Sequence, residues 1–410
     1  MRLRTSLRRP DARAHERGEP PPRAASEAAP RWSAGPALLG YTYKPAAAYA
    51  ARDAGRLLCL RLATNDTCNL RCHYCYADRR ERRTETSMRW ELARDILDQA
   101  ASLGVRSVVY LGGEPLLYAH FWSVLRHMAH LGVIPVVFTN GLLVTRATAS
   151  RLLDLNASVL VKRDGSAASQ NRLTSKGTFE SLDRGLRNLI AAGLADQSMG
   201  TTRLGIASCV TRVNIGDIPD LWRLCRSNNI FPNMERMTVV RSADRRLALS
   251  ALQAARLYDE LRRIDEEEFG FRWPASFSGI PAHSCFIPLS GASVDARGGV
   301  STCPELPAVA SLRNATLAEV LGHPAFLEQR QLDRLLPAPC RSCAEKVYCL
   351  GGCRSKAIRA TGSATAPDPD CSRVREASRR RQSEGPAGST PGSALWTRWN
   401  TCCEGTTPLL

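Results

Sequence analysis

The distribution of cysteine limits what this chain of 410 residues can fold into more than any other feature. Ten of its 15 cysteines fall in two dense arrays. The first array is Cys68, Cys72 and Cys75, and the second is Cys285, Cys303, Cys340, Cys343, Cys349, Cys353 and Cys371. The N-terminus lacks the apolar stretch of a secretory signal, so we expect a cytoplasmic location. Closely spaced cysteines in such a chain favour metal binding by reduced thiolates over disulfides.

Composition excludes two other classes of protein. The chain is 44% hydrophobic and 23% charged, and it has no run of the roughly 18 apolar residues that a membrane span needs. Its formal charge of +17 comes from 56 basic residues, of which 51 are arginine and 5 are lysine, against 39 acidic ones. The central part of the chain has no basic stripe interleaved with aromatic residues. We therefore expect neither a membrane nor a nucleic acid as a partner.

Apolar segments that suit strands alternate with segments of helical period between about Arg56 and Arg241. Such an alternation predicts five or six βα units, with a parallel sheet inside and helices outside. The expected strands are Leu58–Leu62, Ser107–Leu111, Pro135–Thr139, Ser158–Val161 and Arg203–Val210. The expected helices are Trp90–Leu103, Phe121–Leu131, Ala147–Leu155, Phe179–Ala192 and Ile218–Asn228, followed by Ala251–Phe269.

The chain divides by composition into four regions. We expect a disordered leader over residues 1–50, a βα core over 51–270, a small cysteine-rich α+β domain over 271–375 and a disordered tail over 376–410. The third region is rich in Cys, Gly and Pro and cannot assemble a large apolar core of its own. Metal binding is expected to contribute to its folding.

The first array can wrap three corners of an iron–sulfur cubane. Four thiolates are usual for a [4Fe–4S] cluster, so three would leave one iron open to a small molecule. The alternatives are a zinc site completed by His73 or a distant cysteine, or simply three buried cysteines.

Two motifs decide between these alternatives. Cys68-x3-Cys72-x2-Cys75, with the aromatic Tyr74 before the third cysteine, resembles the signature of the radical S-adenosylmethionine (SAM) superfamily. Gly112-Gly113-Glu114-Pro115, at the end of the second expected strand, resembles the family's Gly-Gly-Glu-Pro motif. The resemblance implies a partial (β/α)6 TIM-like barrel and a [4Fe–4S] cluster that binds SAM and generates a 5′-deoxyadenosyl radical.

The same resemblance implies the residues that bind SAM. Gly112, Gly113 and Glu114 would bind the methionyl amino group, and Tyr74 would also contact the cofactor. Thr139-Asn140-Gly141 resembles the family's Thr-Asn-Gly turn. Lys162-Arg163-Asp164-Gly165 stands where many relatives have Ser-x-Asp-Gly, which leaves the ribose contact in doubt. Asn140 and Asp164 are the candidates for that contact.

The second array resembles the SPASM extension of radical SAM enzymes, whereas two structural zinc sites are the alternative. The resemblance implies two auxiliary iron–sulfur clusters, which could accept an electron from a substrate radical. Cys340, Cys343, Cys349 and Cys371 would complete the second cluster. Cys285, Cys303 and Cys353 would hold the first, whose last ligand is solvent, substrate or a group such as His283.

The expected activity is that of a radical SAM oxidoreductase that abstracts hydrogen from an unactivated C–H bond. Only about 40 to 50 low-complexity residues precede the first strand, too few for a domain that grips a leader peptide. We therefore expect a small polar substrate of a sugar or aminocyclitol kind in antibiotic biosynthesis. The alternatives are maturation of a ribosomally made peptide by a thioether or carbon–carbon crosslink, and a non-catalytic iron–sulfur or zinc protein.

Two further roles follow from the expected chemistry. A flavodoxin or ferredoxin type of protein would supply the reducing electron. No general base can be assigned from the sequence, although Asp164, Glu235, Arg241 and Glu305 are candidates.

Overall fold

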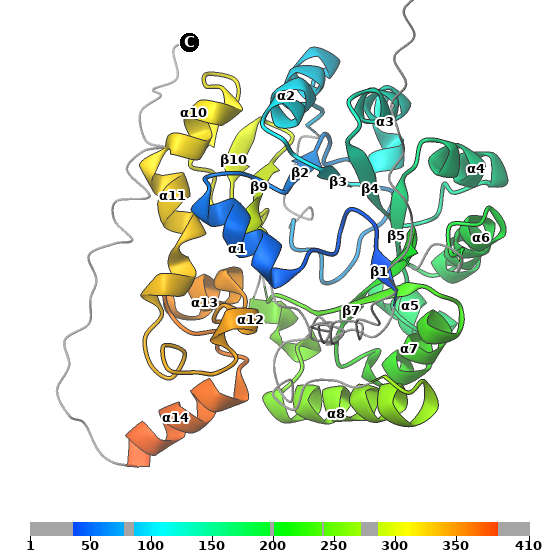
Figure 1. Ribbon diagram of the computed structural model, residues 1–410. Coiled ribbons are helices and arrows are strands. Elements are labelled where there is room, and N and C mark those ends of the chain that lie inside the picture. The colour runs from blue at the N-terminus through cyan, green and yellow to red at the C-terminus, as the bar shows by residue number, and fades with distance from the viewer. Residues whose placement is uncertain (1–35, 78–85, 197–200, 240–241, 272–285, 384–410) are drawn as a thin grey trace, which may run out of the picture.

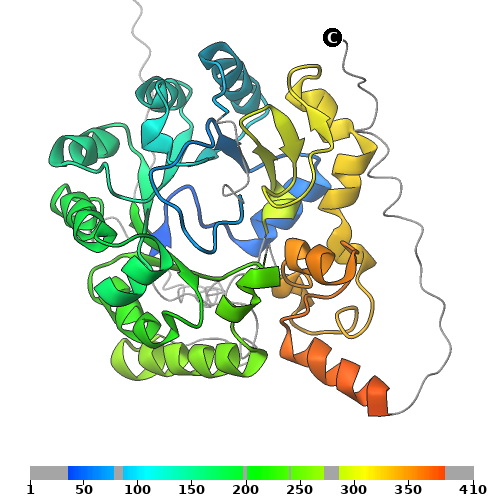
Figure 2. The same cartoon turned by 180° about the vertical axis from the view of Figure 1, so that it is seen from behind.

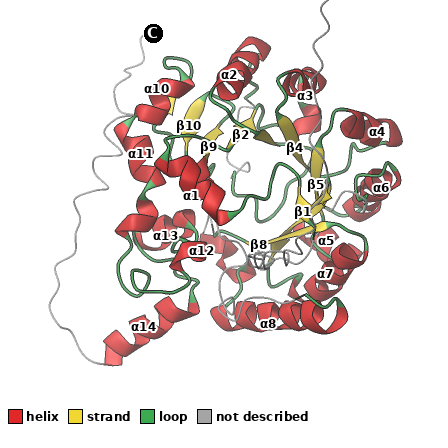
Figure 3. Cartoon of the chain, viewed as in Figure 1, coloured by secondary structure: helices red, strands yellow, loops and turns green. Residues whose placement is uncertain are grey.

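Six parallel strands form the centre of the structure, a computed structural model that describes residues 36–77, 86–196, 201–239, 242–271 and 286–383. The strands pair in the order β2-β3-β4-β5-β7-β8 and lie inside a ring of helices (Figures 1 and 3). Their bounds are Cys59–Ala63, Ser107–Leu111, Ile134–Thr139, Ser158–Lys162, Leu204–Val210 and Phe231–Arg236. The α/β class and the partial (β/α)6 barrel are confirmed.

The outer helices pack on the strands with the periodic apolar faces seen in the sequence. They are α2 (Trp90–Ser102), α3 (Phe121–His130), α4 (Arg146–Asp154), α6 (Thr178–Ala191), α7 (Ile218–Ser227) and α8 (Ala251–Glu268). Ser250 and Gln253 form a capping box at the start of α8. Each of these helices, and each strand that we expected, has bounds within one residue of the expected ones. The sequence did not indicate β8 or the short α5 (Ala167–Leu173).

The strands are buried on both faces. Val108, Val137 and Val159 belong to the main apolar core beneath the helices, whereas the alternate residues Val109 and Val136 belong to a smaller cluster on the opposite face. That second face lines the inside of the barrel, because successive side chains of a strand point to opposite sides.

The cysteine-rich region continues the barrel sheet. Strand β9 (Gly291–Val294) pairs in parallel with β2, and the antiparallel strands β10 (Gly299–Ser301) and β11 (Ala310–Ser311) follow it to give nine strands in one sheet. A Cβ atom at Gly291 would lie 3.1 Å from Sγ of Cys59, so a glycine allows the close approach. The region therefore shares the barrel's core, as its lack of a large core of its own requires.

Helices complete this region. They are α9 (Ile287–Ser290), α10 (Leu317–Gly322), α11 (Pro324–Arg330), α12 (Lys346–Cys349), α13 (Arg354–Thr361) and α14 (Ser372–Ser383). Helix α9 contacts β9 at the edge of the sheet, while α11 packs on α9. Arg330, only 2% exposed, donates hydrogen bonds to the carbonyl oxygens of Leu289 and Arg56. A single buried guanidinium thus joins the cysteine-rich region to the segment that leads into β2.

Two corrections concern the ends of the chain. Residues 36–50, expected to belong to a disordered leader, form β1 (Ala37–Leu38) and much of α1 (Pro45–Asp53). Leu38 is buried among residues of the inner barrel face, and α1 packs against α9 at the barrel end seen nearest in Figure 1. Residues 376–383, expected to be a disordered tail, continue helix α14. Residues 1–35 and 384–410 lie outside the described residues.

No helix among the residues described in the structure is both long and apolar enough to cross a bilayer.

A buried ion pair joins α7 to α8, and its loss should destabilise the barrel. Asp265 is fully buried and accepts hydrogen bonds from Nε and Nη2 of Arg226 at 2.8 and 2.7 Å, and from Nε1 of Trp222 at 2.7 Å. Asp265→Ala leaves the Arg226 charge buried without its carboxylate, so we expect a loss of about 3–5 kcal/mol in the free energy of unfolding. Guanidinium denaturation followed by circular dichroism measures this loss.

The matched control is Glu268→Ala, which removes the half-exposed ion pair of Glu268 with Arg223 on the same two helices. Its unfolding midpoint should stay close to that of the unmodified chain, because solvent screens such a pair. Equal destabilisation by the two substitutions would contradict the assignment.

Candidate active site

The first cysteine array lies on the loop that follows β2, at the C-terminal end of the parallel strands. Figure 2 shows this loop within the ring of strands. Cys68, Cys72 and Cys75 are all half-buried. Burial raises the pKa of Cys72 to about 11, and the nearby thiols of Cys75 and Cys68 contribute to that rise. The structure thus brings together the three thiols that the sequence singled out.

No disulfide joins any of the described cysteines. The described part of the chain also contains no group of three or more His, Cys, Asp or Glu side chains arranged to hold one metal ion. The cysteine arrangement that a cubane needs differs from that of a single metal ion, because each cubane thiolate binds a different iron.

The Gly-Gly-Glu-Pro turn fixes the start of the cysteine loop through its backbone. The amide of Gly113 donates to the carbonyl oxygen of Asn65 at 2.8 Å, and that of Glu114 donates to Thr67 at 2.8 Å. Gly112 has φ +138°, and a Cβ atom there would lie 2.6 Å from the carbonyl oxygen of Asn65. Only glycine permits this contact without displacement of the loop.

The Glu114 carboxylate joins the ends of β3 and β4. Its Oε1 accepts from the hydroxyl of Thr139 at 2.7 Å and its Oε2 accepts from the amide of Asn140 at 2.8 Å. Asn140 in turn donates from Nδ2 to Asn69 at 2.6 Å, and the same nitrogen lies 4.0 Å from Sγ of Cys68. The motif residues are therefore in one place, although the carboxylate itself is 99% buried and already bonded within the protein.

Asp164 is also fully engaged within the protein. It is completely buried, and one carboxylate oxygen accepts from both the Tyr74 hydroxyl and the Lys162 ammonium. The other oxygen accepts from the amide of Cys209 at 3.0 Å. Tyr74 therefore joins the cysteine loop to Asp164, whose side chain has an internal role beside the expected SAM site.

Asn65 is a site residue that the sequence did not indicate. Its Nδ2 donates to the carbonyl oxygens of Thr67 and Glu114, while its Oδ1 is buried with no hydrogen-bond partner among the described residues. Oδ1 lies 2.8 Å from where a Cβ atom of Gly112 would be. An orphaned acceptor beside the glycine turn suits the ammonium group of a SAM molecule. Only the position of Asn65 shortly after β2 could have indicated its role from the sequence.

The structure gathers the four cysteines expected to complete the second auxiliary cluster. Burial raises the pKa of Cys340, and the nearby Cys371 and Cys343 raise it further. Burial likewise raises the pKa of Cys349 to about 12, with contributions from Cys371 and Cys340. Cys340 and Cys349 are therefore close enough to other thiols of the set for their charges to interact.

Cys303 and Cys353, expected to hold the first auxiliary cluster, lie on neighbouring segments. The hydroxyl of Ser355, two residues after Cys353, donates to Glu305 at 2.7 Å, two residues after Cys303. The amide of Cys353 donates to Asp368 at 2.8 Å. Cys285 and His283 lie outside the described residues, and this ligand set stays a prediction.

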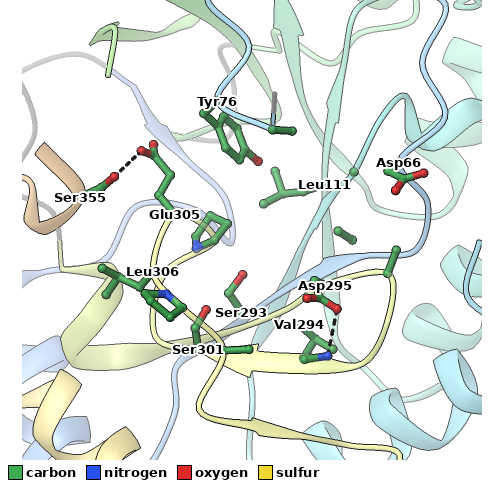
Figure 4. A pocket seen from close by; sticks show the side chains of 18 of the residues that line it. Asp66, Tyr76, Leu111, Ser293, Val294, Asp295, Ser301, Glu305, Leu306 and Ser355 are labelled. Carbon is green, nitrogen blue, oxygen red and sulfur yellow. Dashed lines mark hydrogen bonds between the residues drawn. The ribbon is translucent and has the colours of Figure 1, made fainter. Parts of the chain in front are cut away.

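A cavity of about 660 Å³ separates the first cysteine loop from the Cys303 segment. Tyr76 and Leu111 lie on one side of the cavity, whereas Val294 and Asp295 lie on the other (Figure 4). The Glu305 carboxylate accepts a hydrogen bond from Ser355. The remaining lining is mostly small or apolar and includes Ala63, Ala77, Gly112, Ala296, Pro304, Leu306, Pro307, Ala308 and Ile358.

Of the residues considered as general bases, Glu305 alone lines this cavity among those that the structure describes. Glu235 is exposed and accepts from Asn233, and Arg241 lies outside the described residues. Cys59 and Cys225 are buried core residues, whereas Cys209 is half-buried and close to Asp164.

Comparison with known proteins gives a consistent picture. The model of the radical SAM superfamily matches residues 63–207. The mycofactocin maturase MftC of Mycobacterium ulcerans is 29% identical over 333 residues, which cover 77% of this chain and 87% of MftC. The PqqA peptide cyclase of Granulibacter bethesdensis is 25% identical over 337 residues, which cover 74% of this chain and 84% of the cyclase. The crystal structure of Streptococcus suis SuiB bound to SAM shares the fold, with a TM-score of 0.61, 18% identity and 78% coverage of each chain.

Gly112→Ala should uncouple the cysteine loop from the glycine turn. The added Cβ atom would collide with the backbone of Asn65, and φ +138° is strained for alanine. We expect roughly 10²-fold slower formation of 5′-deoxyadenosine from SAM, because small displacements at a reacting centre have effects of that size. Gly216→Ala is the control, since a Cβ atom there meets nothing within 4 Å. Equal rates for the two variants would contradict the packing argument.

The raised pKa of Cys72 predicts its reactivity in the iron-free chain. With a pKa of about 11, the thiolate fraction should rise about tenfold for each pH unit between 7 and 10. An ordinary cysteine, with a pKa near 8.5, levels off above about pH 9. Iodoacetamide labelling quantified by tandem mass spectrometry distinguishes these profiles, and the unfolded chain supplies the reference. A plateau of the native rate near pH 9 would count against burial as the cause.

Proposed function

Because this chain belongs to the radical SAM superfamily and carries a SPASM-type C-terminal extension, we propose that it modifies a ribosomally made peptide. Its cofactors are a [4Fe–4S] cluster with SAM and auxiliary iron–sulfur clusters. When bound, the first cluster and SAM supply a 5′-deoxyadenosyl radical, which abstracts hydrogen from a C–H bond. The assignment of particular residues to these groups is part of the proposal.

Cys68, Cys72 and Cys75 are proposed to hold the SAM-binding cluster. Asn65 Oδ1, beside the Gly112 turn, would receive the amino group of SAM, because this buried acceptor has no hydrogen-bond partner among the described residues. The other proposed SAM contacts are Tyr74, Gly113, Glu114, Asn140 and Asp164. Glu114 and Asp164 would act through the groups that their buried carboxylates hold in place.

The cavity is the observation that carries the peptide proposal. It lies between the first cysteine loop and the Cys303 segment, so a substrate held there could meet both sites. Its walls combine small and apolar residues with polar ones such as Asp66, Ser293 and Arg359, and two of its carboxylates already accept hydrogen bonds within the protein. The Asp295 carboxylate accepts from the amides of Arg297 and Gly299, and Glu305 accepts from Ser355. Such walls suit a peptide side chain.

This proposal replaces the small polar substrate that the sequence favoured. MftC and the PqqA cyclase, the relatives described above, are named as a mycofactocin maturase and a peptide cyclase. The scarcity of residues before the first strand does not oppose a peptide, because a separate protein can bind the leader.

Three further parts of the proposal concern the surroundings of the reaction. Cys303, Cys353 and Cys285 would hold an auxiliary cluster that supplies a site for the electron left on the substrate. Cys340, Cys343, Cys349 and Cys371 would hold the other auxiliary cluster. A flavodoxin or ferredoxin would provide the reducing electron in the cytoplasm.

Substitution of the three loop thiols tests the cofactor assignment. Anaerobically reconstituted Cys68→Ala/Cys72→Ala/Cys75→Ala should lose one cluster's share of iron and sulfide and form no 5′-deoxyadenosine above background. Cys225→Ala, which alters a buried cysteine on α7, should retain both. If the triple variant keeps full iron content and turnover, the assignment is wrong.

Co-expression tests the substrate class. The chain is produced with each short open reading frame that flanks its gene, and the peptides are analysed by mass spectrometry. A peptide that loses two hydrogen atoms or a carboxyl group, only with the intact first array, supports the proposal. If peptides are unchanged while an aminocyclitol stimulates 5′-deoxyadenosine formation and is itself oxidised, the small-substrate alternative stands instead.

A further inference from the structure

Lys162 places a positive charge next to the first cysteine array. It is the last residue of β5 and stands at the position of the serine in the family's Ser-x-Asp-Gly element. Its side chain is 15% exposed, its ammonium donates to Asp164, and Nζ lies 4.4 Å from the centre of the Tyr74 ring. The chain has 5 lysines in all, so this one is not a product of general lysine richness.

Asp164 is held rigidly from several elements. In addition to the contacts of its carboxylate, its amide donates to Oε1 of Gln170 on α5 at 2.7 Å. Its carbonyl oxygen accepts from Nδ2 of Asn214, in the segment after β7, at 2.7 Å. The ammonium of Lys162 is therefore attached to a fixed anchor.

The same anchor is bonded to the cysteine loop. Tyr74, whose hydroxyl donates to Asp164, lies between Cys72 and Cys75 in the sequence. The Lys162 ammonium, which lies 4.4 Å from the centre of the Tyr74 ring, is therefore next to the cysteine loop itself.

We propose that Lys162 is a positioning residue that raises the reduction potential of the first iron–sulfur cluster, and that Asp164 fixes its ammonium beside the loop that carries Cys72 and Cys75. Reduction adds one electron, and therefore one negative charge, to the cluster. A fixed cation in a poorly solvated site stabilises the reduced form through Coulomb attraction. This inference rests on the proposed assignment of Cys68, Cys72 and Cys75 as the cluster's ligands.

The test is a potentiometric titration of the reconstituted full chain, without SAM, followed by electron paramagnetic resonance. The signal that is absent from the triple alanine variant of the first array belongs to the first cluster. If that variant and the unmodified chain give the same spectra and iron content, the ligand assignment has failed, and the failure is visible before Lys162 is changed.

Opposite shifts are expected from the two partners of the ion pair. Lys162→Met should lower the equilibrium constant for reduction about tenfold, which is about 59 mV toward negative potential for one electron. Asp164→Asn should shift the potential in the positive direction. Lys162→Arg, which keeps the charge, should remain near the unmodified value, and so should Lys176→Met, which removes an exposed lysine.

A purely structural role for Lys162 predicts a different pattern. If Lys162→Met behaves like Lys176→Met, or if it shifts the potential in the same direction as Asp164→Asn, the proposal is overturned. Should Lys162→Met fail to fold because Asp164 is left buried with its charge, the double variant Lys162→Met/Asp164→Asn decides. Its potential should be more negative than that of Asp164→Asn alone, and equality would overturn the proposal.

Discussion

The site depends on a short chain of hydrogen bonds that crosses the ends of three neighbouring strands. The backbone after β2 is held by the amides of Gly113 and Glu114 at the end of β3, and the Glu114 carboxylate is held by Thr139 and Asn140 at the end of β4. The two hydrogen bonds to the Glu114 carboxylate are buried, so they are strong in their setting and costly to leave unmade. The cysteine loop has no regular secondary structure over Cys68–Cys75, and these contacts supply the order that it lacks.

The second organising feature is the pairing of β9 with β2. This pairing makes the cysteine-rich region an extension of the barrel sheet and sets the Cys303 segment opposite the first cysteine loop. A cavity with one wall from each half of the chain results. The location of the proposed substrate site thus follows from the order of strands in one sheet.

The sequence predicted those elements whose signals are local. Buried parallel strands such as Ser107–Leu111 appear in the sequence as apolar runs, and the outer helices appear as apolar residues at helical spacing. The predicted bounds of these elements therefore agree with the observed ones within one residue. Strand β8 was not predicted, because Phe231–Arg236 contains Pro, Asn, Glu and Arg and has no apolar run. Leu38 and the Lys162–Asp164–Tyr74 network could not be predicted in the same way, because their partners are distant in the sequence. For the first array and for Cys340, Cys343, Cys349 and Cys371, the cysteine spacing indicated which thiols lie near one another, since metal ligands leave a pattern in the sequence that hydrogen bonds do not. Their roles as ligands stay a prediction.

The sheet order also has a consequence for how the chain is made. During synthesis β2 emerges early, whereas its partner β9 follows only after the whole barrel has been translated. Until then the strand that leads into the first cysteine loop has an open edge, with unpaired amides and carbonyls exposed to other chains. Long-range pairing of this kind is slow, and it exposes the nascent protein to misassembly. The pairing of β9 with β2 therefore covers the open edge and completes the cavity in the same step.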